Sequence, residues 1–107
     1  SDADLEGASF DAATLEMGVR KKLERLAAQF HESPSELPLL QKLEKATGLL
    51  EDLPFEVNIR TVQNKYYAIL QQTYPRFQKM IDKGDDRAEA WIKVFSSLGE
   101  KLSVRVE

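Results

Sequence analysis

The sequence predicts an all-α domain, a compact bundle of about five helices that ends in a short extended tail. Three observations lead to this fold class. Apolar residues recur at spacings of three and four in five separate segments, as on one face of a helix. Prolines and glycines fall between those segments, where they end helices. The links between segments are only about two to six residues long, which favours antiparallel packing of neighbouring helices.

Length and composition fit one self-sufficient domain. A chain of 107 residues can bury about 65% of its unfolded surface in a single core. Its net charge of −3 creates no field that would attract nucleic acid, so we expect no nucleic-acid partner. No apolar run approaches the roughly 18 residues of a membrane span, so we expect no membrane partner either. The absence of cysteine fits a cytoplasmic location.

The first residues carry no helical period. We expect residues 1–9 to be a disordered lead-in and residues 10–107 to form the single helical domain. The acidic, small-residue start without methionine suggests a fragment of a longer protein, with Ser1 left over from tag removal.

The first helix is expected from Asp11 to about His31. Asp11 is placed to cap it, and Phe10 and Leu15 are spaced to form a hydrophobic staple. The residues of its buried face are Leu15, Val19, Leu23, Leu26, Ala27 and Phe30.

The second helix is expected to begin between Ser35 and Leu37, because Pro38 is tolerated only in a first turn. Pro54 should end it by forcing the preceding residue out of helical geometry. Gly48 lies inside this segment and costs roughly 1 kcal/mol relative to alanine, so either something packs close to it or the helix is weak there. The residues of the buried face are Leu39, Leu40, Leu43, Ala46, Leu50 and Leu53.

The third helix lies within the stretch from Pro54 to Pro75, and the rest of the chain is expected to cover it. Asn58 is a plausible cap, with an earlier start that places Pro54 in the first turn as the alternative. The helix must stop or kink near Tyr74, because Pro75 lacks the N–H that a helix interior needs. The residues of its buried face are Ile59, Val62, Tyr66, Ile69, Leu70 and Thr73.

Two further helices complete the bundle. A short fourth helix carries Phe77, Met80 and Ile81, and Gly84 is expected to end it in the left-handed conformation. Asp86 and Glu89 have the spacing of a capping box for the fifth helix. The residues of its buried face are Ala88, Trp91, Phe95, Leu98 and Leu102.

After Gly99 the apolar residues alternate, at Leu102, Val104 and Val106, as in a strand. One strand cannot form a sheet alone. We therefore expect an extended tail that either docks on the bundle or pairs with the link at residues 55–57.

Chemical motifs are missing. His31 is the one histidine, and its position favours a role at a helix C-terminus. The three acidic residues around Gly84, which are Asp82, Asp85 and Asp86, are most simply explained by helix capping. The sequence predicts no catalytic residue, no metal ligand and no cofactor.

A basic group on the first helix is interrupted by acidic residues one turn away. Its residues are Arg20, Lys21, Lys22 and Arg25, and the acidic residues are Glu16 and Glu24. Opposite charges at spacings of three and four form ion pairs on a solvated helix face. We therefore expect this face to be salt-bridged and not to bind nucleic acid.

A second stripe on the third helix is polar and aromatic where a plain solvent face would be mostly charged. Its residues are Arg60, Asn64, Tyr67, Gln71 and Tyr74. Such a stripe either makes hydrogen bonds within the domain or faces a partner. It is the candidate contact surface, and Tyr67 and Tyr74 are the two side chains that could stack on the apolar face of a carbohydrate.

Several segments of the chain, in this order, give it a resemblance to a known domain. They are Leu53-Pro54-Phe55-Glu56-Val57-Asn58, Gln63-Asn64-Lys65-Tyr66-Tyr67, Trp91 to Phe95, and Leu98-Gly99-Glu100-Lys101-Leu102. Over roughly residues 15–106 the chain resembles the C-terminal part of an uncharacterised helical domain. That domain follows the catalytic barrel in bacterial and archaeal proteins of the family-57 glycoside hydrolase type, the α-amylase and α-mannosidase-like group. The bulky aromatic residue that this family has near Ile59 and Arg60 is absent here.

The resemblance implies a non-catalytic accessory module that packs against, or is tethered to, an upstream catalytic domain of the same chain. The catalytic carboxylates of that family belong to the barrel, so the resemblance assigns no catalytic residue to this chain. The alternative is a helical protein–protein interaction module unrelated to carbohydrate.

Overall fold

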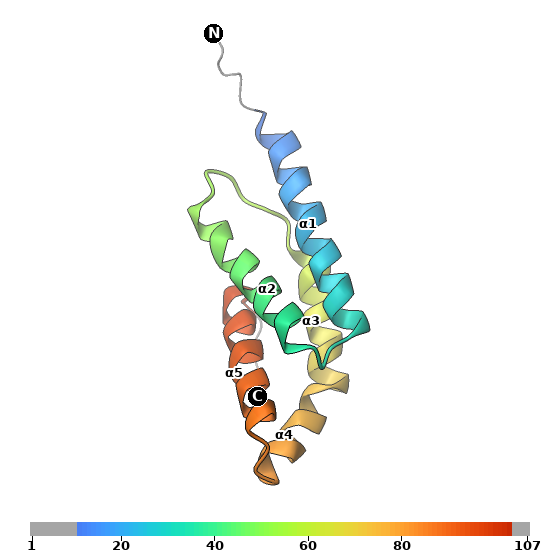
Figure 1. Cartoon of the computed structure of the whole chain (residues 1–107). Helices are drawn as coiled ribbons and strands as arrows, with labels where there is room; N and C mark the ends of the chain where they lie inside the picture. Colours follow the sequence, from blue (N-terminus) through green and yellow to red (C-terminus); the bar gives the residue numbers. More distant parts are fainter. Residues whose placement is uncertain (1–10, 104–107) are drawn as a thin grey trace.

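The computed structural model describes residues 11–103, which form five α-helices and one short 3₁₀ helix (Figure 1). The elements are α1 (Ala12–Glu32), α2 (Leu37–Gly48), η2 (Leu49–Asp52), α3 (Arg60–Gln72), α4 (Tyr74–Asp82) and α5 (Asp86–Lys101). No strand occurs within residues 11–103, so the all-α prediction is confirmed. The predicted lead-in at residues 1–9, the Phe10 half of the staple, and Val104 and Val106 of the predicted tail lie outside the described residues.

Helices α1, α2 and α3 run alternately down and up an elongated bundle, α4 continues the direction of α3, and α5 runs back (Figure 1). Helices α3 and α4 follow one another as a single bent rod, so the bundle has four rods. Helix α1 packs on α2 and α3, while α5 packs on α2 and α4. These contacts close a ring in which each rod touches two others, and the core lies along its axis.

Aromatic rings fill much of that core. The Trp91 ring stacks on Phe77 at a centroid distance of 4.0 Å and on Phe95 at 4.6 Å. Phe95 also stacks on Tyr66, at 4.1 Å. The Tyr66 hydroxyl donates a hydrogen bond to the Phe95 carbonyl oxygen at 2.6 Å. Burial raises the pKa of this phenol well above its ordinary value, because the anion would lose its hydration. The ring stack therefore joins α3, α4 and α5.

The starts of the first two helices agree with the prediction. The Asp11 carboxylate accepts hydrogen bonds from the backbone N–H groups of Ala13 and Thr14, as a helix cap does. Pro38 lies in the first turn of α2.

Helix α2 ends at Gly48, earlier than the predicted stop before Pro54, and the chain continues as η2. A Cβ atom on Gly48 would lie 2.9 Å from Cε of Lys101, so the flexible end of this side chain from α5 passes close to the glycine. Both explanations proposed for Gly48 apply. A side chain lies close to it, and the α-helix ends there and continues as a tighter 3₁₀ helix.

Helix α3 begins close to the predicted cap. The Asn58 side-chain oxygen accepts a hydrogen bond from the backbone N–H of Arg60 at 3.0 Å, and residues 54–59 precede the helix in non-helical form. The alternative start at Pro54 is therefore wrong. The predicted interruption before Pro75 is confirmed, because α3 ends at Gln72 and α4 begins at Tyr74.

Gly84 ends α4 as predicted, with a φ of +83°. Its backbone N–H donates to the Ile81 carbonyl. A residue with a Cβ atom is strained in this left-handed conformation.

We expect Gly84→Ala to lower the free energy of unfolding by about 1–2 kcal/mol, because alanine must adopt that strained φ. Gly18→Ala is the matched control, since Gly18 is exposed on α1 and a methyl group there would have no neighbour within 4 Å. Alanine at residue 18 should raise the free energy of unfolding by up to about 1 kcal/mol. Urea denaturation followed by circular dichroism measures both changes, and opposite signs are the expected result.

The cap of α5 lies one residue earlier than predicted. The Asp85 carboxylate, and not that of Asp86, accepts hydrogen bonds from the backbone N–H groups of Arg87 and Ala88 at 2.9 and 3.2 Å. Position N3 is then Ala88, so Glu89 cannot complete a capping box. Either of the two adjacent aspartates could cap the helix according to the sequence. The path of the chain after Gly84 determines that Asp85 is the cap.

We expect Asp85→Ala to destabilise the fold by about 1 kcal/mol, because two backbone N–H groups lose their acceptor. Asp86→Ala should cost only a few tenths of a kcal/mol, since that side chain interacts with the helix dipole alone. Thermal and urea unfolding of the two variants compare them directly. Equal losses would contradict the assignment of Asp85 as the cap.

The end of α5 decides between the two predictions for Leu102, which was placed both on the buried face of the fifth helix and at the start of an alternating tail. Leu102 is fully buried and continues the helical path, with its N–H donating to the Leu98 carbonyl at 2.9 Å. Its own carbonyl oxygen accepts a hydrogen bond from the Gln63 side chain at 2.6 Å. Ser103 has a φ of +61°, as residues that follow a helix often do. Leu102 therefore belongs to the helical core, because its spacing of four from Leu98 outweighs the alternation that follows it.

A polar cluster joins α2 to α5. One carboxylate oxygen of Glu44 accepts hydrogen bonds from the Lys101 ammonium at 2.7 Å and from the Ser97 hydroxyl at 2.9 Å. The Lys101 hydrogen bond, together with the Ser97 hydroxyl, holds the pKa of Glu44 below its ordinary value of 4.5.

This lowered pKa predicts a pH dependence. The folded state binds the Glu44 proton less tightly than the unfolded state, so the contribution to stability is complete above pH 4.5 and is lost as the pH falls through the lowered pKa. Because the pair is partly exposed, we expect Glu44→Gln to cost under about 1 kcal/mol at pH 7 and less at pH 3. Urea denaturation at both pH values tests this. In a Lys101→Met background the difference between the two pH values should shrink.

Candidate functional site

Four of the five residues of the predicted contact stripe lie together on the surface of α3. Arg60, Asn64, Tyr67 and Gln71 are all exposed, and the Tyr67 side chain is 53% exposed. Asn64 precedes Tyr67 by three residues and Gln71 follows it by four, so both amides lie beside the ring on the helix surface. This arrangement offers one exposed aromatic face flanked by hydrogen-bonding groups.

The structure contradicts the prediction that Tyr74, the fifth residue of the stripe, lies on the surface. Only 8% of it is exposed, and its ring centroid lies 5.7 Å from that of Phe95 in the core. The predicted stripe assumed one continuous helix as far as Tyr74. Helix α3 ends at Gln72, and Tyr74 is the first residue of α4, so its direction follows the packing of α4 on α5. The surface stripe therefore contains one exposed aromatic residue, not two.

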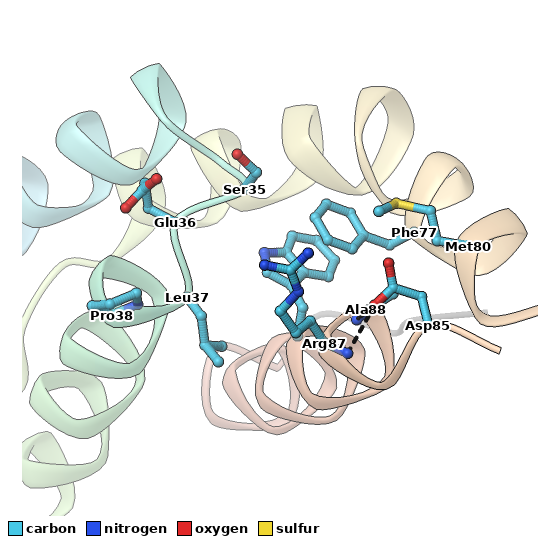
Figure 2. A pocket seen from close by; sticks show the side chains of 10 residues that line it. Ser35, Glu36, Leu37, Pro38, Phe77, Met80, Asp85, Arg87 and Ala88 are labelled. Carbon is cyan, nitrogen blue, oxygen red and sulfur yellow. Dashed lines mark hydrogen bonds between the residues drawn. The ribbon is translucent and has the colours of Figure 1, made fainter.

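A pocket of about 430 Å³ lies where the link between α1 and α2 meets α4 and the start of α5 (Figure 2). Phe77 and Trp91 form its floor, but both rings are buried almost completely, and the Trp91 indole N–H already donates to the Pro34 carbonyl at 2.7 Å. Figure 2 shows Arg87 reaching across the pocket from α5, close to Phe77 in this view.

The polar groups of this pocket do not converge on a ligand position. The Asp85 carboxylate is engaged by the start of α5, and Figure 2 draws one of these hydrogen bonds. Glu36 and Arg87 carry opposite charges and lie on different elements at the rim. The pocket is therefore a recess beside the core whose polar groups mainly serve the helix start.

An apolar groove lies between α1 and the end of α2, a region that the sequence analysis did not select. Its volume is about 220 Å³. The residues that line it are Val19, Lys22, Leu23, Ala46, Leu49, Leu50 and Leu53. We call this the α1–α2 groove. Leu49 stands at its edge with 60% of its surface exposed, the largest value among the exposed large apolar residues in the described part of the chain.

One signal in the sequence could have identified this groove. Leu49 lies beside Leu50 but outside the predicted buried face of the second helix, so a leucine was left over on its solvent side. Leu15 was placed on the buried face of the first helix, but 44% of it is exposed, and it does not line the groove. An exposed leucine beside an apolar groove is typical of an interaction surface.

One charged side chain, Lys22 of α1, lines the groove, and other charged residues of α1 pair with one another. The predicted salt-bridged face is present, with Arg20 lying 3.1 Å from Glu16 and 4.0 Å from Glu24. The backbone N–H of Asn58 also donates to Glu16, and with Arg20 it keeps the pKa of Glu16 below its ordinary value. Lys22 at the groove forms no ion pair within residues 11–103.

The described residues offer neither a metal site nor a membrane span. Within residues 11–103, no group of three or more histidine, cysteine, aspartate or glutamate side chains could hold a metal ion. None of the helices in the same part of the chain is both long and apolar enough to cross a membrane. His31 lies in the last turn of α1, where the sequence placed it.

Comparison of the chain with models of protein families, with curated proteins and with solved structures finds no match. The surface features of the bundle and the resemblance noted in the sequence are therefore the grounds for a function.

Proposed function

We propose that this chain is a non-catalytic helical module that mediates protein association through the α1–α2 groove, within a larger carbohydrate-active protein. The observation that carries the proposal is the exposed Leu49 beside an apolar groove of about 220 Å³. Burying apolar surface is the main driving force of protein association, and it contributes about 25 cal/mol per Å². An apolar groove rimmed by charged side chains has the layout of an interface, with a dry centre and a polar edge.

The larger protein is proposed from the resemblance to the helical domain of family-57 glycoside hydrolase-like proteins. In that arrangement an upstream catalytic domain performs the chemistry, and this module, in the cytoplasm, contributes contacts alone. The alternative is a protein-interaction module that has no link to carbohydrate, and it would use the same contacts at the groove.

Site-specific photo-crosslinking tests the association. A benzophenone amino acid is introduced at position 49 of the full-length protein in the cells that produce it, and adducts are identified by mass spectrometry. Gln78 is the matched control, because it is exposed on α4 at the other end of the bundle. We expect a defined protein adduct from position 49 that is absent from position 78. The same adducts, or none, from both positions would overturn the proposal.

Direct carbohydrate contact is a second candidate function, and the exposed Tyr67 with Asn64 and Gln71 beside it favours this idea. An aromatic face stacks on the apolar face of a sugar while amides bond its hydroxyl groups. NMR titration with maltooligosaccharides should shift the amide signals around Tyr67, and Tyr67→Ala should abolish the shifts. Unchanged signals at millimolar ligand would exclude this function.

A further inference from the structure

The solvent side of α2 and η2 carries a row of three exposed residues that changes from basic to apolar to acidic. The row is Lys45, Leu49 and Asp52. Lys45 precedes Leu49 by four residues in an α-helix, which places both on one side. Asp52 follows Leu49 by three residues in a 3₁₀ helix, where side chains three apart eclipse.

The two charges are equally far from Leu49. Four residues of α-helix rise about 6 Å, at roughly 1.5 Å per residue. Three residues of 3₁₀ helix also rise about 6 Å, at roughly 2.0 Å per residue. Backbone angles at Gly48 and Leu49 stay in the right-handed helical region, so the row continues through the junction. Leu49 is therefore the midpoint of a row with opposite charges at its two ends.

Such a row is complementary to itself when turned end for end. A two-fold axis through Leu49 would bring each Lys45 opposite Asp52 of the other copy. The two Leu49 side chains would meet at the axis beside the α1–α2 grooves. Neither Lys45 nor Asp52 forms an ion pair within residues 11–103. The Lys45 charge contributes, as the smallest of the causes, to the lowered pKa of the Glu44 carboxyl beside it, and Lys45 is exposed on the surface.

We propose that the partner that covers the exposed edge of the α1–α2 groove is a second copy of this chain, bound across a two-fold axis at Leu49. This inference rests on the proposed function, because it names the partner for the same groove. The module then joins two copies of the protein that carries it. The contact is small and depends on two symmetric charge pairs, so the dimer is weak and its affinity falls as salt is added.

Sedimentation equilibrium between about 10 µM and 1 mM tests the dimer. We expect the average mass to rise with concentration from the monomer value of 12.2 kDa toward twice that value. Leu49→Glu should keep the chain monomeric over this range, since it places two carboxylates at the axis. Circular dichroism should show unchanged helix content, because Leu49 is mostly exposed.

A charge-swap series gives the specific result. Lys45→Glu and Asp52→Lys should each raise the dissociation constant roughly tenfold by setting like charges opposite one another. The double variant Lys45→Glu/Asp52→Lys restores both opposite-charge pairs and should return the constant to within about threefold of its original value. Lys93→Glu, an exposed change on α5, is the control and should leave it unaltered.

Two outcomes would overturn the inference. One is a chain that stays monomeric at 1 mM, and the other is a dimer that responds to neither Leu49→Glu nor the charge series. In either case an adduct from position 49 with a different protein would leave the proposed function standing. These experiments can therefore reject the dimer without rejecting the proposed function.

Discussion

Replacing Trp91 with alanine should lower the free energy of unfolding by about 3–5 kcal/mol, the largest loss expected from a single substitution in this bundle. Trp91 is 1% exposed, and its ring lies between Phe77 of α4 and Phe95 of its own helix. The substitution removes the largest buried side chain and leaves a cavity that rigid neighbouring helices can fill only in part. Because domains of this size are stable by only about 5–15 kcal/mol, much of the stability would be lost.

Urea denaturation followed by far-ultraviolet circular dichroism is the suitable measurement, because this variant lacks the one tryptophan of the chain. Trp91→Phe separates packing from hydrogen bonding. It keeps an aromatic ring but loses the indole N–H that donates to the Pro34 carbonyl, so we expect a smaller loss of about 1–2 kcal/mol. A loss below about 1 kcal/mol for Trp91→Ala would contradict the position of the ring at the centre of the core.

Tyr74→Ala should cost about 3 kcal/mol, whereas Tyr67→Ala should change stability by less than about 0.5 kcal/mol. The two tyrosines were placed on the same surface stripe by the sequence. In the structure Tyr74 is 8% exposed and lies beside Phe95, while Tyr67 is 53% exposed. The loss at Tyr74 comes from removing a buried ring at the start of α4, and Tyr67 has no comparable burial to lose.

The same urea measurement, on both variants at one pH, gives this comparison. Tyr74→Phe is the control that keeps the ring and removes only the hydroxyl, and we expect it to retain most of the stability. A loss below about 0.5 kcal/mol for Tyr74→Ala, equal to that for Tyr67→Ala, would mean that both tyrosines are exposed. That result would restore the original five-residue stripe.

Most helix boundaries could be predicted because they depend on residues close in sequence. Asp11 caps α1 through its own backbone neighbours, Pro38 is confined to a first turn, and Gly84 supplies the positive φ that ends α4. The errors lie where two local solutions compete. Asp85 and Asp86 are both good caps, and the start of α5 decides between them.

The surface could be predicted less well than the core. The face of α3 up to Gln71 was placed correctly, because its period of 3.6 is undisturbed. Tyr74 was misplaced because α3 ends before Thr73, and the packing of α4 on α5 then sets the direction of the Tyr74 ring. The groove at Leu49 was not predicted, because its existence depends on how α1 packs beside α2, which the sequence pattern does not give.

The sequence by itself determined that this chain is helical, where most helices begin and end, and that Trp91, Tyr66 and Phe95 are buried. These properties follow from hydrophobic period and from capping groups, which act within one or two turns. Only the tertiary structure decided that Tyr74 is buried and that Leu49 stands exposed at a groove. Burial at those positions depends on the contacts between helices that lie far apart in the chain, and no local pattern records them.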